Sequence, residues 1–163
     1  MARVGVLCWQ AAYRGILPAE FLAGLSVEPR AVAWETLLES EGNKDAPTWV
    51  AERDGRVTGY LSSGPARDDD TPLHTAEIYA VYVLPGKWRK GAGRALLDAA
   101  VEYWLEHGAA GLVLWTFKAN ASAHAFYEAL SWRPDGARRE IDLGGFSVPE
   151  VRYRLAPEGA RPA

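Results

Sequence analysis

The segment from Thr75 to Leu97 constrains the fold more than any other part of the sequence. It reads TAEIYAVYVLPGKWRKGAGRALL, in which β-branched and aromatic residues lead into a basic, glycine-rich loop and then into apolar residues at helical spacing. A helix start presents backbone N–H groups that have no intrahelical partner, together with the positive end of the helix dipole. The pattern therefore predicts a strand, an anion-binding loop and a helix, in that order.

The loop carries both flexible backbone and positive charge. Gly91 and Gly93 let a ligand approach the backbone closely. A dinucleotide-binding fingerprint needs a third glycine where Leu96 stands, and the phosphate loop of nucleoside triphosphatases needs Lys-Ser/Thr where Ala92 follows its last glycine. We therefore expect a phosphate-bearing ligand of another kind. The cations around the loop are Lys87, Arg89, Lys90 and Arg94.

The residues after the loop predict a helix, a strand and a second helix. Apolar residues recur at helical spacing from Leu96 to Leu105, and Gly108 stands where a C-cap glycine would end that helix. The stretch 111–116 is typical of a buried strand. The stretch 120–132 predicts a helix with Asn120 as its N-cap.

Periodicity and turn residues predict the remaining elements. Asp54-Gly55 between two β-prone runs is typical of a tight hairpin turn. The loop 64–72 is expected to be exposed, and its aspartates, 68 to 70, either attract a cationic amine or are simply solvated. The other predicted segments are helices over 3–15 and 30–41, hairpins over 48–63 and 139–155, and a frayed tail over 157–163.

Composition predicts one soluble, cytoplasmic catalytic domain over residues 1–156. The chain has 163 residues, 48% of them apolar, which suffices for a single core. A net charge of −3 argues against a nucleic-acid or membrane-surface partner. A single cysteine, Cys8, fits a reducing compartment, and no apolar run has membrane-spanning length. We expect no metal site, because His74, His107 and His124 lie far apart without a matching Cys or Glu pair.

Two motifs resemble those of the GNAT superfamily of N-acetyltransferases, which transfer an acetyl group from acetyl-CoA to an amine. Residues 88–93 are similar to the family's pyrophosphate loop, and residues 9–22 to its first helix and the loop that follows. The resemblance covers roughly residues 3–156 and implies an α/β fold with a mixed, mostly antiparallel sheet flanked by helices. The second motif is matched by Asn120, Ala123, Phe126, Tyr127, Glu128 and Trp132.

The sequence departs from the family pattern at three places. Trp88 stands where the family usually has Gln or Arg, but the backbone makes most of the phosphate contacts. Ser131 replaces the glycine that usually follows the second-motif helix. The chain also begins inside the expected first helix, so either the sheet lacks the family's first strand or the true start lies upstream.

The resemblance implies a site for acetyl-CoA as co-substrate. The backbone of Val81, Tyr82 and Val83 is expected to pair with the pantetheine arm and to donate to the thioester oxygen. Asn120 contacts the pantetheine region, acts only as the N-cap, or does both. The pyrophosphate is expected to lie on Trp88, Arg89, Lys90, Gly91, Ala92, Gly93 and Arg94.

The acceptor amine needs a base. An amine of pKa about 10 is unprotonated in roughly one molecule in a thousand at pH 7, which adds about 4 kcal/mol to the barrier. Glu77 starts the strand that leads to the loop and is the candidate base, with its pKa raised by partial burial. The alternatives are that Glu77 is solvated or pairs with an arginine. Tyr127 resembles the family's tyrosine near the CoA sulfur, where it would donate to the leaving thiolate; alternatively it is a core aromatic.

These residues predict an acetyltransferase that acts on a primary amine of a small molecule or peptide. Direct attack is expected, because Cys8 has no histidine partner for a covalent intermediate. Trp9 and Tyr13, at helical spacing, and Tyr79 are expected to line the substrate pocket, with core packing as the alternative for the first two. The alternative function is a non-catalytic acyl-CoA-binding regulatory or interaction module. The resemblance also makes a homodimer one expected oligomeric state.

Overall fold

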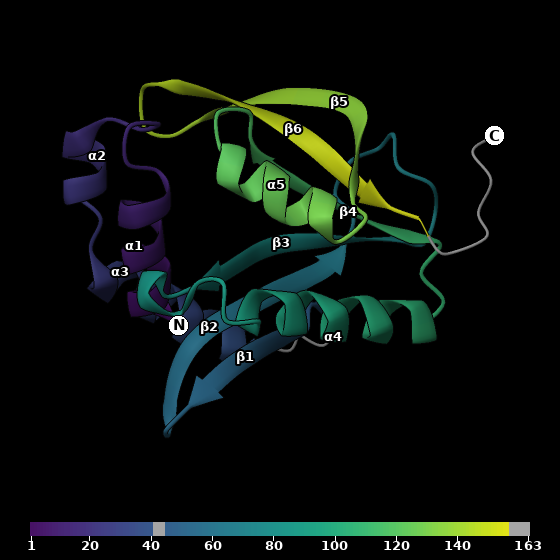
Figure 1. Ribbon diagram of the computed structural model, residues 1–163, viewed down its shortest axis with the longest axis horizontal. Helices are drawn as coiled ribbons and strands as arrows, with labels where there is room; N and C mark the ends of the chain where they lie inside the picture. Colours follow the sequence, from purple (N-terminus) through teal and green to yellow (C-terminus); the bar gives the residue numbers. More distant parts are fainter. Residues whose placement is uncertain (41–44, 157–163) are drawn as a thin grey trace. The chain divides into compact units, whose positions relative to one another are not determined.

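The computed structural model describes residues 1–40 and 45–156, and its strands confirm the predicted α/β fold. Within these residues the strands form one mixed six-stranded sheet in the order β1-β2-β3-β4-β6-β5. The elements are shown in Figure 1. In chain order they are α1 (Ala2–Ala12), α2 (Ala19–Ala23), α3 (Val27–Glu39), β1 (Thr48–Arg53), β2 (Arg56–Pro65), β3 (Thr75–Val83), the 3₁₀ helix η2 (Pro85–Lys87), α4 (Ala92–Glu106), β4 (Gly111–Phe117), α5 (Ala121–Ala129), β5 (Arg133–Asp142) and β6 (Ser147–Leu155).

The chain forms two compact units, and β2, β3 and α4 contribute to both, β2 only by its last residue, Pro65. The first unit comprises Met1–Gly64 and Ala80–Ala100; the second comprises Pro65–Tyr79 and the chain from Val101 onward. Strand β3 therefore ends in the first unit after starting in the second, and α4 starts in the first and ends in the second. The predicted tail, 157–163, lies outside the described residues.

In the first unit, α1 packs against β2 and β3 through an apolar cluster. Val4 and Cys8 on α1 are 4% and 2% exposed and contact Tyr60 of β2, which is 5% exposed. Trp34 of α3 and Tyr82 of β3 pack against the same cluster, and the rings of Tyr60 and Tyr82 lie 5.5 Å apart. This cluster fixes α1 beside the part of β3 that leads to the basic loop.

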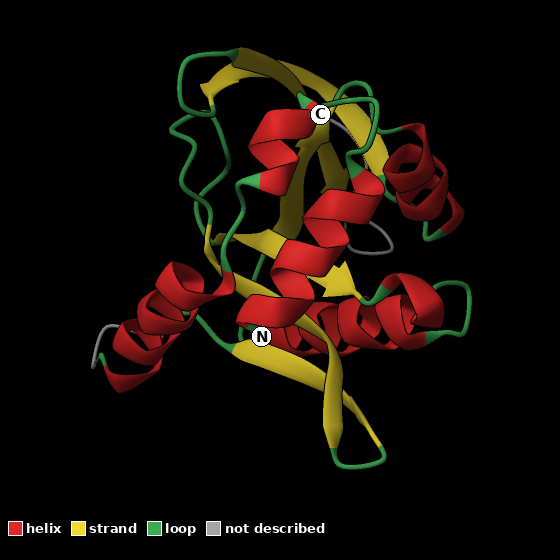
Figure 2. Cartoon of the chain, turned by 90° about the vertical axis from the view of Figure 1, so that its left-hand side faces the viewer, coloured by secondary structure: helices red, strands yellow, loops and turns green. Residues whose placement is uncertain are grey.

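The first predicted hairpin is confirmed. Arg53 pairs with Arg56 across a two-residue turn in which Asp54 and Gly55 both have positive φ, 54° and 70°. These are the signs that a type I′ turn requires, and they explain the Asp-Gly pair. The hairpin of β1 and β2 is visible at the lower right of Figure 2.

In the second unit, β4 is the central buried strand. Leu112, Val113 and Leu114 are at most 1% exposed, as expected for a strand covered on both faces. β4 pairs along its length with β6 in antiparallel fashion, but its parallel pairing with β3 covers only the stretches 75–78 and 111–114. The described part of β3 continues five residues beyond that ladder, to Val83.

Three predicted boundaries are wrong, each for a local reason. Helix α3 begins at Val27 rather than residue 30, because Pro29 occupies the first turn, where proline is tolerated. Helix α1 ends at Ala12 rather than residue 15, because the chain turns there, with Gly15 at φ +79°. Helix α2 was not predicted, because its five residues are too few to show a period. Strand β5 begins at Arg133, six residues before the prediction, because it is an edge strand that accommodates Pro134. Residue 41, the predicted end of the second helix, lies outside the described residues.

Two of the departures from the family pattern, at Ser131 and at the start of the chain, can be followed in the structure. Ser131 adopts φ +67°, the left-handed conformation that favours glycine, so the turn after α5 keeps the geometry expected of the usual residue. Within the described chain, three helices precede the first strand. None of the helices in residues 1–40 and 45–156 is both long and apolar enough to cross a bilayer.

The close contact of β2 with β3 at Gly59 gives a stability prediction. A Cβ at Gly59 would lie 2.8 Å from the Tyr82 carbonyl oxygen and 3.0 Å from the Val83 side chain. We expect Gly59→Ala to lower the free energy of unfolding by about 1–3 kcal/mol and Tm by about 2–10 °C in thermal denaturation. Gly86→Ala is the control, because a Cβ there meets nothing within 4 Å. Equal Tm values for the two variants would contradict the contact.

Candidate active site

The loop between β3 and α4 is fixed at its start by hydrogen bonds within the first unit. The Leu84 N–H donates to the Thr58 carbonyl at 2.8 Å, which ties the end of β3 to β2. The Trp88 indole N–H donates to the Val83 carbonyl and folds the large side chain back over the loop. Trp88, the departure from the family pattern, therefore has a structural role in this loop.

The start of α4 presents free backbone donors. The first helical hydrogen bond runs from the Ala95 N–H to the Gly91 carbonyl at 2.9 Å. The N–H groups of Ala92, Gly93 and Arg94 precede that bond and have no acceptor inside the helix. Gly91 has φ +88°, and a Cβ there would meet nothing within 4 Å, so the space in front of the loop is open. The geometry suits a phosphate group.

Four cationic side chains lie close to this helix start in the sequence. Arg89 is exposed and holds φ +57°, a conformation that costs a non-glycine residue about 1–2 kcal/mol. Such strain collects at ligand sites. The Lys90 ammonium donates to the Gly86 carbonyl at 3.0 Å, and the Arg94 guanidinium lies 3.4 Å from the exposed Asp98 carboxylate. These weak surface contacts leave the cations available to a polyanion.

The structure brings together Trp9, Tyr13 and Tyr82, three of the predicted site residues. The rings of Trp9 and Tyr13 meet edge to face at 4.9 Å, and the Trp9 indole N–H donates to the Tyr82 hydroxyl at 2.8 Å. Burial raises the pKa of Tyr82 above its usual value, with the bond from Trp9 opposing it. The end of α1 is therefore attached to the β3 segment that is predicted to bind the cofactor.

Glu77 is buried and held by an arginine that sequence reasoning missed. It is 1% exposed, and its Oε2 accepts hydrogen bonds from the backbone N–H and Nε of Arg67, each at 3.1 Å, while Nη2 binds Oε1. This interaction raises the pKa of the Arg67 guanidinium. Of the alternatives open for Glu77, the arginine pair is present and solvation is wrong. Arg67 lies in a stretch that the sequence predicts to be an exposed loop. No sequence pattern indicates its ion pair with Glu77.

Tyr79 takes part in the same cluster in the second unit. The Arg67 guanidinium carbon lies 4.3 Å from the centre of the Tyr79 ring, and the Tyr79 hydroxyl donates to the Pro65 carbonyl at 2.7 Å. The predicted pocket residue thus supports the arginine that binds Glu77. Trp9 and Tyr13, the other predicted pocket residues, belong to the first unit.

The second motif lies on α5 in the second unit. The Asn120 carboxamide oxygen accepts from the Ala123 N–H at 3.2 Å, which confirms the predicted N-cap. Tyr127 is 8% exposed, and its ring lies 6.3 Å from Trp132 and 5.9 Å from Tyr153 of β6. Tyr127 is therefore part of an aromatic cluster. Its role toward a thiolate stays a prediction, as does a cofactor contact by Asn120.

The sequence matches the Acetyltransferase (GNAT) family over residues 9–132, and the chain belongs to that family. It is 33% identical to the uncharacterized N-acetyltransferase YuaI of Bacillus subtilis over 153 residues, which are 93% of this chain and 83% of that protein. It is 31% identical to rat N-acetylaspartate synthetase over 117 residues, which are 66% of this chain but only 38% of that protein.

Solved structures share the fold. The PaiA N-acetyltransferase of Thermoplasma acidophilum, in complex with coenzyme A, is 18% identical with a TM-score of 0.70, over 94% of this chain and 90% of that one. The acetyltransferase YncA of Salmonella typhimurium, with acetyl-CoA, is 26% identical with a TM-score of 0.62, over 85% of this chain and 78% of that one. Both likenesses agree with the mixed sheet and helices described above.

Cys8 is buried in the first unit and its thiol is hydrogen-bonded. Its thiol donates to the Val83 carbonyl at 3.0 Å, and burial raises its pKa to about 12. The thiolate is the reactive form, so at pH 8 we expect a disulfide reagent to label the native chain about 1,000-fold more slowly than the denatured chain. Absorbance of the released thiol follows the reaction. Native labelling at the rate of a free cysteine would contradict the buried, hydrogen-bonded thiol.

Proposed function

We propose that the protein is a cytoplasmic enzyme that transfers the acetyl group of acetyl-CoA to a primary amine of a small molecule or peptide. The observation that carries the proposal is the start of α4, where N–H groups without a helical acceptor and an open left-handed glycine stand beside four cationic residues in the sequence. Coenzyme A or acetyl-CoA in two structures of the same fold supports this choice of ligand. The four cations are Lys87, Arg89, Lys90 and Arg94.

Three parts of the chain would hold acetyl-CoA. The backbone at residues 88–94 would bind the pyrophosphate. The backbone of Val81–Val83, beyond the end of the parallel ladder with β4, would pair with the pantetheine arm and donate to the thioester oxygen as negative charge develops there. Asn120 would contact the same arm, although its carboxamide oxygen already caps α5.

The reaction is direct attack of the amine on the thioester. The amine nitrogen forms a bond to the carbonyl carbon, the bond from that carbon to sulfur breaks, and the products are an amide and the thiol of CoA. The proton lost by the amine goes to a base, and the sulfur gains a proton. A hydrogen bond from Tyr127 would stabilise the leaving sulfur, since full proton transfer from a phenol to this thiolate is uphill by about 2 kcal/mol.

Glu77 is the proposed base, and its contacts limit how it can act. Arg67 occupies the Oε2 atom with two hydrogen bonds and the Oε1 atom with one. A carboxylate has about four acceptor positions, so one remains. Because Glu77 is 1% exposed, the proton would travel through a water molecule rather than by direct contact with the amine.

The same contacts favour a second candidate function. If the Arg67 pair serves only to anchor the 64–72 segment, the chain can bind acyl-CoA without turnover, as a regulatory or interaction module. Amine-dependent release of CoA separates the two functions. A screen of small amines and peptide N-termini, with CoA detected by a thiol reagent, is the direct test. A homodimer, expected from the resemblance, stays a prediction.

Gly91→Glu tests the phosphate site. The new carboxylate would project into the open space before α4 and repel the pyrophosphate. We expect calorimetric titration to show a loss of acetyl-CoA affinity of about 100-fold or more, which is the effect of placing like charges in one small site.

A matched control separates this effect from backbone strain. Gly136 has φ +93° in β5, and a Cβ there also meets nothing within 4 Å. Gly136→Glu therefore introduces the same side chain at a similar backbone angle in another element, β5. We expect it to retain acetyl-CoA affinity. Equal losses in both variants, or unchanged affinity in Gly91→Glu, would remove the loop from the cofactor site.

Glu77→Gln tests the base. Without a base the reaction depends on amine that is already neutral, so we expect kcat/KM to fall by about 100-fold or more at pH 7. The loss should shrink toward pH 10, where the amine deprotonates unaided. Acetyl-CoA affinity should change little. The measurement is a pH–rate profile of both proteins, with calorimetry for the cofactor.

Glu150→Gln is the control for a structural effect. Glu150 is 7% exposed, and its Oε2 accepts from the Arg139 Nε at 2.7 Å, so it is also a buried glutamate bound by an arginine. We expect Glu150→Gln to lower Tm without changing the shape of the pH–rate profile. If Glu77→Gln behaves in the same way, Glu77 is an anchor and the base lies elsewhere.

A further inference from the structure

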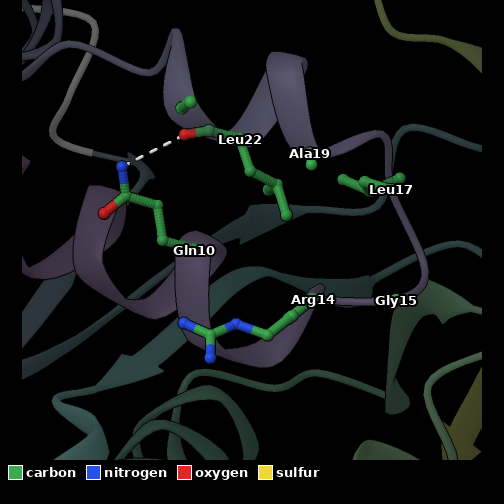
Figure 3. Close-up of a pocket in the computed structure, with 7 residues that line it drawn as sticks. Gln10, Arg14, Gly15, Leu17, Ala19 and Leu22 are labelled. Carbon is green, nitrogen blue, oxygen red and sulfur yellow. Dashed lines mark hydrogen bonds between the residues drawn. The ribbon is translucent and has the colours of Figure 1, made fainter.

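A cavity in the first unit lies between the end of α1 and α2. Its volume is about 270 Å³, and Figure 3 shows its walls. Leu17, Ala19 and Leu22 stand on one side, and Gln10 and Arg14 of the α1 end stand on the other. The complete lining is Gln10, Arg14, Gly15, Leu17, Ala19, Leu22 and Ala23.

The two sides of this cavity differ in chemistry. Leu17 and Leu22 are 5% and 6% exposed and form an apolar floor. The Gln10 amide group donates to the Leu22 carbonyl at 3.1 Å, which fixes its side chain across the gap between the two helices. A ligand in this space would therefore meet an apolar surface on one side and polar groups on the other.

Arg14 is the one charged residue among the described residues that line the cavity. Among residues 1–40 and 45–156, no carboxylate lies within ion-pair distance of its guanidinium. A guanidinium at the edge of an apolar cavity is suited to bind a carboxylate in bidentate fashion. The single guanidinium of Arg14 would balance the charge of one carboxylate.

The cavity is adjacent to residues predicted to form the acceptor pocket. Gln10 and Arg14 directly follow Trp9 and Tyr13 in the chain. Trp9 in turn donates to the hydroxyl of Tyr82 on β3, so the same end of α1 contacts both the cavity and the proposed cofactor strand. A ligand of this cavity would rest on the helix that reaches that strand.

We propose that Arg14 selects the acceptor: the cavity takes the carboxylate end of an amino acid with an apolar side chain. The carboxylate binds the Arg14 guanidinium, and the side chain lies on Leu17 and Leu22. This inference rests on the proposed acetyl transfer, because it names the class of amine that the enzyme uses. A free amino acid and the C-terminal residue of a short peptide share this chemistry.

The test compares two acceptors that differ only at the carboxylate. L-leucine and L-leucinamide have the same side chain and a primary amine, but only leucine has the negative charge. Initial rates of CoA release are measured for the wild type, Arg14→Gln and Arg3→Gln. Arg3 is exposed on the same helix and does not line the cavity, so its variant removes the same charge as a control.

We expect Arg14→Gln to lower the ratio of kcat/KM for leucine to that for leucinamide by about 10- to 100-fold, the size of a charged hydrogen bond. Comparison of this ratio between proteins cancels the different basicity of the two amines. Arg3→Gln should leave it unchanged. Leucyl-glycine and glycyl-leucine as further acceptors distinguish a free amino acid from a peptide terminus. A ratio unaffected by Arg14→Gln would overturn the assignment while acetyl transfer itself stands.

A binding measurement keeps the assignment testable without turnover. N-acetyl-L-leucine carries the carboxylate and the apolar side chain and needs no reaction. We expect it to shift the methyl resonances of Leu17 and Leu22 in NMR spectra, with affinity reduced about 10-fold or more in Arg14→Gln only. Binding of this kind without CoA release from any amine would uphold the cavity assignment and reject the proposed enzyme. No shift at these methyl groups, together with no carboxylate preference, would overturn the cavity assignment.

Discussion

Two buried charges in the second unit determine the path of the segment between β2 and β3. Glu77 of β3 is 1% exposed and Arg152 of β6 is 4% exposed. A buried charge is costly unless it is paired and hydrogen-bonded, and both residues find partners in that one segment. Arg67 binds Glu77, while Asp68 and Asp70 bind Arg152. The segment is thus fixed to two strands, although most of its residues are exposed.

The aspartates between residues 68 and 70 are only in part the solvated groups that the sequence predicts. Asp69 and Asp70 are exposed, but the Arg152 guanidinium binds Asp68 and Asp70 and holds the pKa of the Asp70 carboxyl below its usual value. The Trp115 indole N–H also donates to Asp68 at 2.8 Å. Asp68 is 84 residues from Arg152 in sequence, and local patterns carry no information on such a pairing.

Features set by local chemistry were predictable. The Asp54-Gly55 turn and the Asn120 cap each follow from a residue type that satisfies one backbone requirement. The open loop before α4 was equally predictable, because glycine at position 91 and a helix start lie side by side in the sequence. By contrast, Arg67 beside Glu77 depends on tertiary packing, as does the contact of Trp9 with Tyr82. The sequence therefore identified candidate site residues but not their partners.

The Arg67 pair also restricts the chemistry open to Glu77. A carboxylate with three hydrogen bonds cannot turn toward a substrate, so a base at this position would act through its one open acceptor position on Oε1. The direction of that lone pair is set by Arg67, whose segment is in turn held by Arg152. A change at Arg152 would then alter the position of the base without touching it. The ion pairs of the second unit would link the stability of this segment to proton transfer.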